Sequence, residues 1–552
     1  MELHEYTLPA LFDISIEKFA TRPAVSFVDQ AAITYAKLGE QKEKISTFLY
    51  NEGIRPGDKV AIISENSPNW VACFWAITGI GAVVVPLLPD FSKTEIENIL
   101  KHSDAKVLFI SRRIYKRHEG HLNFDGVLIF LDNFTTIDNP DSTDNLIDNI
   151  QFDDKVKDLA SKINPEDVAS IIYTSGTTGR SKGVMLTHEN LTYEVEKVLL
   201  VQDVNEADIF LSLLPLSHVY ENVLGMILPI RQGASVIYIS KPPTPSVLVA
   251  AMGKVRPTMI LMVPLIIEKI YQNRIYPELT KNKILKRALH IWPINVWLNN
   301  IAGKKLKQAL GGRIRFLGVG GAALNPQTER FLRDARFPYS CGFGLTETSS
   351  LIFASKVGKV KFRSVGKPLN GLSYRIIKPD KHTRIGEVVV RWKGNMKGYY
   401  KEPEMTASVL TDGNWFHTGD LAEMINGNMY LKGRSKTMIL GPSGENIYPE
   451  EIESVLNRME GVVESLVFEK KGKIVAKVYM NTEDLARKYS FFKDAATYHS
   501  AEIHQKINHY LTDMCKQLNA HLNRFSQVAK LELVNKPFEK TATHKIKRHL
   551  HL

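Results

Sequence analysis

One short segment, Tyr173-Thr-Ser-Gly-Thr-Thr-Gly-Arg-Ser-Lys-Gly183, concentrates small hydroxyl residues, glycines and a lysine. It lies between two apolar stretches, 168–173 and 184–186, that are expected to be strands. Glycines let successive backbone N–H groups turn toward one anion, and hydroxyl and ammonium groups add further donors. The segment therefore predicts a loop that binds the phosphates of a nucleotide. A Walker loop is excluded, because Gly179 is separated from Lys182 by two residues instead of preceding it directly.

The bulk composition is that of an ordinary globular chain with a basic balance. At 552 residues it is too long for one compact core, and its 44% hydrophobic and 24% charged content is typical of a folded protein. Three well-separated cysteines offer neither a disulfide framework nor the spacing of a metal site, which suits a reducing, cytoplasmic location. The net charge of +12 would attract anionic lipid or a phosphate-rich small molecule, or it is simply a solvated basic surface. Nucleic acid is not an expected partner, because no zinc-finger, helix-turn-helix or aromatic-basic strand motif is present.

The pattern of apolar residues predicts several packed layers. Short apolar stretches at 60–64 and 107–110 alternate with helix-like segments, which indicates a layered α/β fold with a mostly parallel sheet. Residues 66–89 carry no formal charge, but their glycines and prolines favour a buried helix and a buried strand over a membrane span. Residues 360–432 contain short strands separated by Gly and Pro turns and predict a small β-rich subdomain. Two amphipathic stripes further on predict the helices of a small α+β domain at the C-terminus.

The phosphate loop resembles the signature loop of the adenylate-forming superfamily, which comprises acyl-CoA synthetases, nonribosomal peptide adenylation domains and luciferases. The resemblance implies a large N-terminal adenylation domain at 1–433, a hinge at 434–436 and a small mobile C-terminal domain at 437–552. It also implies that the loop binds ATP through Thr174, Ser175, Gly176, Thr177, Thr178, Gly179 and Lys182.

Further motifs follow in the order that the resemblance implies. Val319-Gly-Gly-Ala-Ala-Leu324 is similar to the loop that passes under adenine, and Gly342-Phe-Gly-Leu-Thr-Glu-Thr348 to the family's Tyr-Gly-x-Thr-Glu motif, with phenylalanine in place of tyrosine. By resemblance, Thr346 would meet the α-phosphate, and Glu347 with Thr174 would bind Mg²⁺, a cation that prefers oxygen ligands. The adenine site would include Gly321, Ala322, Gly342, Phe343, Gly344 and Leu345.

Three more residues are assigned by resemblance to the ribose, the hinge and the reaction. Asp420, in Trp-Phe-His-Thr-Gly-Asp, would accept hydrogen bonds from both ribose hydroxyls. Arg434 would contact ribose or phosphate, and Lys436 occupies the hinge position. Thr-Ala-Thr-His-Lys-Ile resembles the terminal Thr-x-Thr-Gly-Lys-Ile motif, which makes Lys545 the adenylation lysine, although His544 replaces the usual glycine.

The acyl site is also implied by resemblance. Leu214-Pro-Leu-Ser-His-Val-Tyr-Glu221 is similar to the family segment beside the acyl carboxylate, and 263–271 is similar to a segment of the long-chain branch. The acyl pocket would include His218, Gly225, Val263 and Gly320, with His218 also shaping thioester formation. The apolar and aromatic residues at 288–298 extend an acyl tunnel, form a membrane-facing patch or make an ordinary helical hairpin.

The predicted activity is ATP- and Mg²⁺-dependent activation of a long- or medium-chain fatty acid to acyl-AMP, followed by transfer to coenzyme A. Residues 441–449 resemble the loop that enters the pantetheine tunnel in the second step. The alternatives are a fatty acyl-AMP ligase that loads a carrier protein, a catalytically silent lipid- or nucleotide-binding relative, and a peripheral membrane scaffold.

Overall fold

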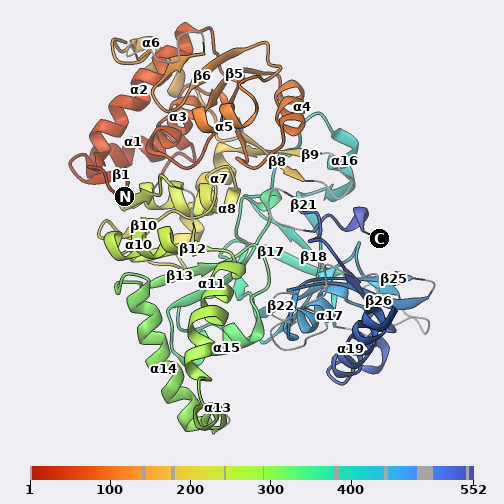
Figure 1. The fold of residues 1–552 in the computed structure, drawn as a ribbon. Helices are drawn as coiled ribbons and strands as arrows, with labels where there is room; N and C mark the ends of the chain where they lie inside the picture. Colours follow the sequence, from red (N-terminus) through yellow and green to blue (C-terminus); the bar gives the residue numbers. More distant parts are fainter. Residues whose placement is uncertain are drawn as a thin grey trace.

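The computed structural model describes most of the chain in one large and one small assembly of layers (Figure 1). The described residues are 3–137, 145–175, 181–241, 244–289, 291–377, 384–440, 446–470, 472–481, 501–541 and 546–551. The large part is red to cyan in Figure 1, and the small C-terminal part is blue. The mixed α/β class expected from the sequence, with a large N-terminal and a smaller C-terminal domain, is confirmed.

The first sheet has the strand order β19-β9-β8-β4-β3-β5-β6-β7. Its members are β3 Lys59–Ile63, β4 Val83–Leu87, β5 Ala105–Ile110, β6 Val127–Phe130, β7 Thr135–Thr136, β8 Val168–Ser175, β9 Ser181–Thr187 and β19 Gly398–Tyr399. The run β8-β4-β3-β5-β6 within this sheet is parallel, in agreement with the predicted mostly parallel sheet. β8 and β9 form an antiparallel hairpin, and β19 pairs with its outer edge although it follows more than two hundred residues later.

A second sheet has the order β16-β15-β14-β13-β12-β10-β11-β1-β2. Its members are β1 Pro23–Phe27, β2 Ile33–Thr34, β10 Ile209–Leu211, β11 Ser235–Tyr238, β12 Met259–Met262, β13 Phe316–Val319, β14 Tyr339–Phe343, β15 Phe353–Ala354 and β16 Lys367–Pro368. The run from β14 to β1 is parallel, so the carboxyl ends of β12, β13 and β14 meet at one edge.

Helices cover and connect these sheets. They are α1 Leu8–Phe19, α2 Tyr35–Asn51, α3 Pro68–Gly79, α4 Lys93–Ser103, α5 Arg112–Arg117, α6 Asp154–Ala160, α7 His188–Leu199, α8 Val219–Glu221, η1 Asn222–Ile227, α9 Leu228–Arg231, α10 Pro245–Val255, α11 Pro264–Ile270, η2 Tyr271–Ile275, α12 Tyr276–Leu279, α13 Lys283–Ala288, α14 Trp292–Ala309, α15 Pro326–Asp334, η3 Thr346–Thr348 and α16 Pro403–Val409.

The uncharged segment at 66–89 is a buried helix followed by a buried strand, as predicted. The Ser67 side chain caps α3 by accepting a hydrogen bond from the Trp70 N–H, and Pro68 occupies the first turn. Every residue of α3 except Asn69 is buried, and so is all of β4. None of the helices in the described ranges combines the length and the apolar character that crossing a bilayer requires.

The predicted β-rich subdomain is also present. Its strands are β17 Ser373–Ile377, β18 Gly386–Arg391, β20 Leu410–Thr411, β21 Trp415–Ile425 and β22 Asn428–Arg434, ordered β17-β18-β21-β20 with β22 on β21. All of these pairs are antiparallel.

The C-terminal part contains β23 Ile439–Leu440, β24 Asn446–Ile447, α17 Pro449–Leu456, β25 Val462–Lys470, β26 Lys473–Met480, α19 Ala501–Asn519, η6 Arg524–Ser526, β27 Lys530–Val534 and η7 Arg548–Leu550. Its sheet has the order β25-β26-β27 and forms a separate hydrophobic cluster with α17 and α19. The predicted stripe of α19 is confirmed at Ile507, Leu511, Met514 and Leu518, which are all buried.

Candidate active site

The predicted phosphate loop lies in sequence between β8 and β9, which pair as antiparallel strands. Thr174 lies opposite Lys182, and Ser175 lies opposite Ser181, in the antiparallel register. This register places the Thr174 hydroxyl and the Lys182 ammonium group at the base of the same turn. Gly176–Gly179 and the Ser175 side chain lie outside the described residues, so their predicted phosphate contacts remain predictions.

Lys182 sits in a mixed electrostatic environment at the base of the hairpin. Its Nζ lies 5.0 Å from the centroid of the Tyr399 ring, within range of a cation–π interaction. Burial lowers the pKa of Lys182, the charge of Lys436 lowers it further, and Glu347 and Glu402 oppose this shift. The structure therefore brings the predicted phosphate-binding lysine, magnesium ligand and hinge lysine into one electrostatic neighbourhood.

Glu347 belongs to η3 and accepts two hydrogen bonds, one at its side chain and one at its backbone carbonyl. The Tyr399 hydroxyl donates a 2.9 Å hydrogen bond to Glu347 Oε1, and the Met396 N–H donates a 2.8 Å bond to the Glu347 carbonyl. Burial raises the pKa of Tyr399, and the neighbouring carboxylate raises it further, so the phenol keeps its proton and remains a donor. Sequence analysis did not single out Tyr399, because nothing local distinguishes it from a core tyrosine.

Strand β19 carries Tyr399 to this position. Gly398 and Tyr399 pair with Met185 and Val184 of β9, and the Tyr400 N–H bonds the carbonyl of Gly183 at 2.8 Å. The strand joins the phosphate hairpin to the Glu347 turn, so all three segments form one structural unit.

The predicted adenine motif shows why glycine is needed there. A Cβ added to Gly344 would lie 1.6 Å from the Ser350 carbonyl oxygen, so backbone packing leaves no room for a side chain. A Cβ at Gly342 would lie 2.4 Å from the Leu351 side chain. Phe343 is 9% exposed and packs into the core with its ring centroid 6.5 Å from that of Phe353.

The second adenine loop follows β13. Gly321 has a φ of 83°, in the left-handed region that favours glycine, and Ala322 is exposed beside it. Leu345 precedes η3, and its N–H donates to the Thr348 hydroxyl at 3.0 Å. Thr346 opens the turn that carries Glu347.

Asp420 and Arg434 are cross-strand partners. They pair directly between β21 and β22, and Arg434 Nε lies 3.1 Å from Asp420 Oδ1. Asp420 is only 7% exposed, while the arginine side chain is about half exposed. The Ser435 N–H bonds the Gly419 carbonyl at 2.9 Å and fixes the chain just before the predicted hinge residue Lys436. The structure thus brings the two residues predicted at the ribose together.

Of the predicted acyl-site residues, Val263 directly follows β12 and Gly320 directly follows β13. His218 caps α8, and its Nδ1 accepts a 3.2 Å hydrogen bond from the Tyr220 N–H. A Cβ added to Gly320 would lie 3.0 Å from the Tyr220 ring, and one added to Gly321 would lie 3.7 Å from Val263. Tyr220, which sequence analysis did not single out, therefore lies against the wall that Gly320 forms.

The residue after Tyr220, Glu221, carries a buried carboxyl group. Glu221 is 1% exposed, and its Oε1 accepts a 2.5 Å hydrogen bond from the Ser212 hydroxyl. Its Oε2 is buried without a hydrogen-bond partner among the described residues. Burial raises the pKa of Glu221 to about 8. Gly225 lies in the π-helix η1, where an added Cβ would come within 2.6 Å of this carboxyl group, so its predicted place in the acyl pocket is next to Glu221.

Two predicted segments are not described. Lys545 and its neighbour His544 lie outside the described residues, as do 441–445 of the predicted pantetheine loop. The predicted role of Lys545 stays a prediction.

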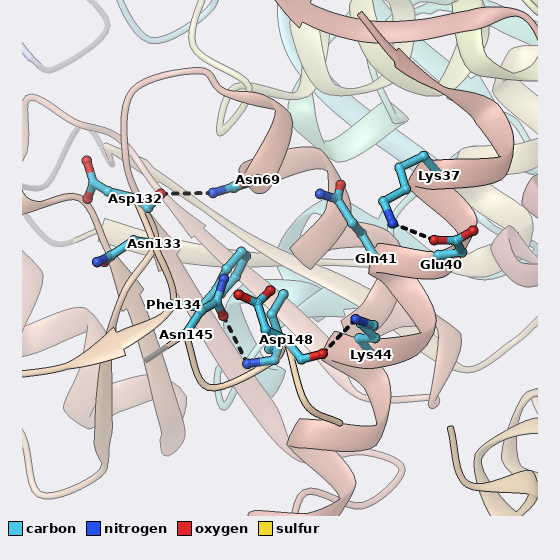
Figure 2. A pocket seen from close by; sticks show the side chains of 11 residues that line it. Lys37, Glu40, Gln41, Lys44, Asn69, Asp132, Asn133, Phe134, Asn145 and Asp148 are labelled. Carbon is cyan, nitrogen blue, oxygen red and sulfur yellow. Dashed lines mark hydrogen bonds and ion pairs between the residues drawn. The ribbon is translucent and has the colours of Figure 1, made fainter. Parts of the chain in front are cut away.

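A small polar hollow lies elsewhere on the N-terminal part (Figure 2). It has a volume of about 150 Å³ and is lined by Lys37, Glu40, Gln41, Lys44, Asn69, Asp132, Asn133, Phe134, Asn145, Ile147 and Asp148. None of the predicted site residues lines it. Lys37 forms a 2.6 Å ion pair with Glu40, and Lys44 donates a 2.9 Å hydrogen bond to the Asp148 carbonyl (Figure 2).

The chain is similar to known proteins over most of its length. The family model described as AMP-binding enzyme matches residues 12–400. Long chain acyl-CoA synthetase 1 of Arabidopsis thaliana is 28% identical over 530 residues, covering 86% of this chain and 79% of the relative. The chloroplastic long-chain-fatty-acid–[acyl-carrier-protein] ligase AEE15 of the same plant is 26% identical over 547 residues, covering 83% and 74%. The solved structure of Bacillus subtilis O-succinylbenzoate coenzyme A synthetase with ATP and magnesium has a TM-score of 0.73 at 22% identity and covers 98% of each chain.

Proposed function

Because the chain belongs to the AMP-binding enzyme family, we propose that it activates a long- or medium-chain fatty acid as acyl-AMP and then transfers the acyl group to coenzyme A. In the first step the carboxylate attacks the α-phosphorus of ATP and pyrophosphate leaves. In the second step the thiol of coenzyme A attacks the acyl carbonyl and AMP leaves. The observation that carries the proposal is the cluster of Lys182, Glu347 and Tyr399 at the base of the β8–β9 hairpin.

Nucleotide binding is supported by the arrangement at three strand ends. The hairpin base carries Thr174 and Lys182, which would contact the phosphates, and the glycine-containing loops after β13 and β14 would pass beside the adenine ring. The Asp420 carboxylate offers acceptors that match the two hydroxyls of a ribose, and Arg434 beside it adds a positive charge.

The donor set around Glu347 fits magnesium. Carboxylate and hydroxyl oxygens from Glu347 and Thr174 are the hard ligands that this ion shares with phosphates. The hydrogen bond from Tyr399 uses only Oε1 of the carboxylate. A Mg²⁺ ion held by Glu347 and Thr174 would offset the negative charge of the phosphates.

The first step requires positioning and charge neutralisation more than covalent help from the protein. In this proposal Lys182 would contact the outer phosphates, and Thr346 the α-phosphate. We assign to Lys545 the bridging of the carboxylate and the α-phosphate oxygens. Removing a contact of this kind from a transition state typically costs on the order of a hundredfold in rate.

The second step would use a rotation of the C-terminal domain. We propose that residues 1–433 and 437–552 move as units about the hinge at 434–436, with Lys436 as the pivot. In the present structure β22 contacts α17: Lys432 lies 3.8 Å from Glu451, and a Cβ added to Gly433 would lie 2.9 Å from the Glu450 carboxylate. The proposed rotation would separate these side chains.

The fatty acid would occupy the site bounded by His218, Val263 and Gly320, with Gly225 and the buried Glu221 behind it. The name of the Arabidopsis synthetase supports a long-chain acid. Tyr220 against Gly320 would set how the acid enters beneath the nucleotide.

One observation favours a carrier protein as a second candidate acceptor of the acyl group. The relative AEE15 is named a ligase for an acyl-carrier protein and aligns with 83% of this chain. A carrier protein in place of coenzyme A is therefore the alternative acceptor, with the first step unchanged.

The test is pyrophosphate release with MgATP and a panel of fatty acids from short to very long, with and without coenzyme A. Release that depends on coenzyme A and peaks at medium or long chains supports the proposal. Acyl-AMP formation that coenzyme A does not discharge, but a carrier protein does, supports the alternative. No release with any acid would contradict both.

A further inference from the structure

The helical hairpin α13–α14 exposes an unusual amount of apolar surface. Trp292 is 79% exposed, Ile284 78% and Trp297 63%. Exposed single apolar residues are common on proteins, but contiguous exposed patches usually mark an interaction surface. The hairpin-tip patch, as we name it, consists of Ile284, Ile291, Trp292, Ile294, Trp297 and Ile301.

The two faces of α14 differ in character. Ile294, Trp297 and Ile301 follow at helical spacing and form one exposed stripe. The opposite face is buried through Asn299, Ala302, Gly303 and Leu306. It packs on the body of the protein so closely that a Cβ on Gly303 would lie 2.6 Å from the Ala335 side chain. The exposed stripe is thus held outward by a fixed helix.

Positive charge surrounds the hairpin-tip patch. Residues 271–313 contain nine Lys and Arg residues and one acidic residue, Glu278, which gives a net charge of +8 within this segment. Glu278 is itself ion-paired with Lys305 at 3.0 Å. Lys281, Lys283 and Arg287 are exposed next to the patch, and Lys304 continues the outer face of α14.

We propose that the hairpin-tip patch docks on the surface of an anionic lipid bilayer. Tryptophan and isoleucine would enter the boundary between headgroups and acyl chains, and the flanking lysines and arginines would attract lipid phosphates. Exposed apolar side chains bordered by positive charge complement this surface, whereas a bare apolar patch would not specify it. The tip projects from the body at the bottom of Figure 1, where no other labelled element covers it.

In chain order, the hairpin lies between Val263 and Gly320, two residues of the candidate acyl site. The segment that contains it leaves β12 at Val263 and returns through β13 to Gly320. A membrane bound at the tip would hold the acyl site near the phase in which long-chain fatty acids dissolve.

The test measures co-sedimentation of the full chain with sucrose-loaded vesicles of phosphatidylcholine alone or mixed with phosphatidylglycerol. The patch variant is Trp292→Ser with Trp297→Ser, and the charge variant is Lys283→Glu with Arg287→Glu. Matched controls in the C-terminal part are Phe525→Ser, which alters an exposed aromatic residue, and Lys516→Glu with Lys530→Glu. Pyrophosphate release with a water-soluble acid, without vesicles, verifies that every variant is folded.

The wild-type chain is expected to bind the anionic vesicles at least tenfold more tightly than phosphatidylcholine, and high salt should weaken binding because exposed charges are screened. The patch and charge variants should each bind at least tenfold more weakly, and the controls should bind like the wild type. Unchanged binding by the patch variant would overturn the proposal, as would loss confined to the C-terminal controls. A wild-type chain that ignores vesicles but dimerises through the tip, in a way that Trp292→Ser abolishes by sedimentation velocity, would also overturn it.

Discussion

The Tyr399 hydroxyl donates a 2.9 Å hydrogen bond to Oε1 of Glu347, across 52 residues of sequence. The tyrosine is 5% exposed and reaches the carboxylate because β19 is added to the edge of β9. The bond orients a carboxylate at the point where the family resemblance implies magnesium. Tyr399 is therefore a positioning residue for Glu347.

Tyr399→Phe should raise the magnesium concentration needed for half-maximal pyrophosphate release and lower the rate by about tenfold, since a hydrogen bond to a charged group contributes about 1.5–3 kcal/mol. The ring and its packing remain, so the melting temperature should change little. The measurement is pyrophosphate release as a function of magnesium at saturating ATP.

Tyr400→Phe is the matched control for this prediction. It removes a 3.0 Å hydrogen bond from the next residue to Asp104, away from Glu347. A magnesium dependence that is the same in both variants would show that Tyr399 acts only through the fold.

Asp420→Ala should raise the KM for ATP at least tenfold, because a well-placed hydrogen-bonding carboxylate typically contributes more than about 1.4 kcal/mol. It should also remove any discrimination against 2′-deoxy-ATP and 3′-deoxy-ATP, which the wild type should use poorly. Glu423→Gln is the control, because Glu423 and Lys432 form a 2.9 Å ion pair between the same two strands outside the nucleotide site. Retained discrimination in Asp420→Ala would remove this residue from the ribose site.

Lys545→Ala should lose acyl-AMP formation by about a hundredfold or more and keep thioester formation from supplied acyl-AMP. The two half-reactions are measured separately, by pyrophosphate release and by acyl-CoA production from synthetic acyl-AMP. Lys547→Ala, in the same basic segment, should affect neither. Equal loss of both half-reactions in Lys545→Ala would contradict the assignment.

Glu221→Gln should flatten the dependence of stability on pH. Burial raises the pKa of Glu221 from 4.5 to about 8, so between these values the folded state holds a proton that the unfolded state releases. The stability that this proton contributes is fully present below pH 4.5 and is lost as the pH rises through about 8.

The melting temperatures of wild type and Glu221→Gln, compared from pH 4.5 to 8.5, test this expectation. The wild type should lose more than about 1 kcal/mol relative to the variant over this range. Parallel curves for Glu221→Gln and the wild type would show that the carboxyl group is ionised in the folded protein.

Much of the fold could be predicted because its signals are local. The buried helix and strand at 66–89, the β-rich strands at 360–432 and the apolar stripe of α19 all follow from periodicity and turn residues within short windows. The phosphate hairpin could be predicted for the same reason, since Thr174 and Lys182 are close in sequence and pair in the antiparallel register of β8 and β9.

The segment at 288–298 shows a limit of prediction from the local sequence pattern. Its residues form the helical hairpin that was one of the three interpretations, but the apolar pattern did not indicate which side chains face inward. In the structure Trp292 and Trp297 are exposed, so neither lines an acyl tunnel. Their exposure depends on α14 burying its opposite face against α15, a contact between segments that periodicity cannot identify.

The sequence by itself determined the layered α/β class, the family resemblance and the order of the nucleotide-binding motifs, because each depends on neighbouring residues. Tertiary structure alone decided that Tyr399 orients Glu347, that Phe343 packs into the core and that Glu221 is buried behind Gly225. These contacts join segments that are distant in sequence through sheet pairing and close packing. The hydrogen bonds and the shifted pKa values depend on this geometry and burial. They therefore arise only when the distant segments pack together.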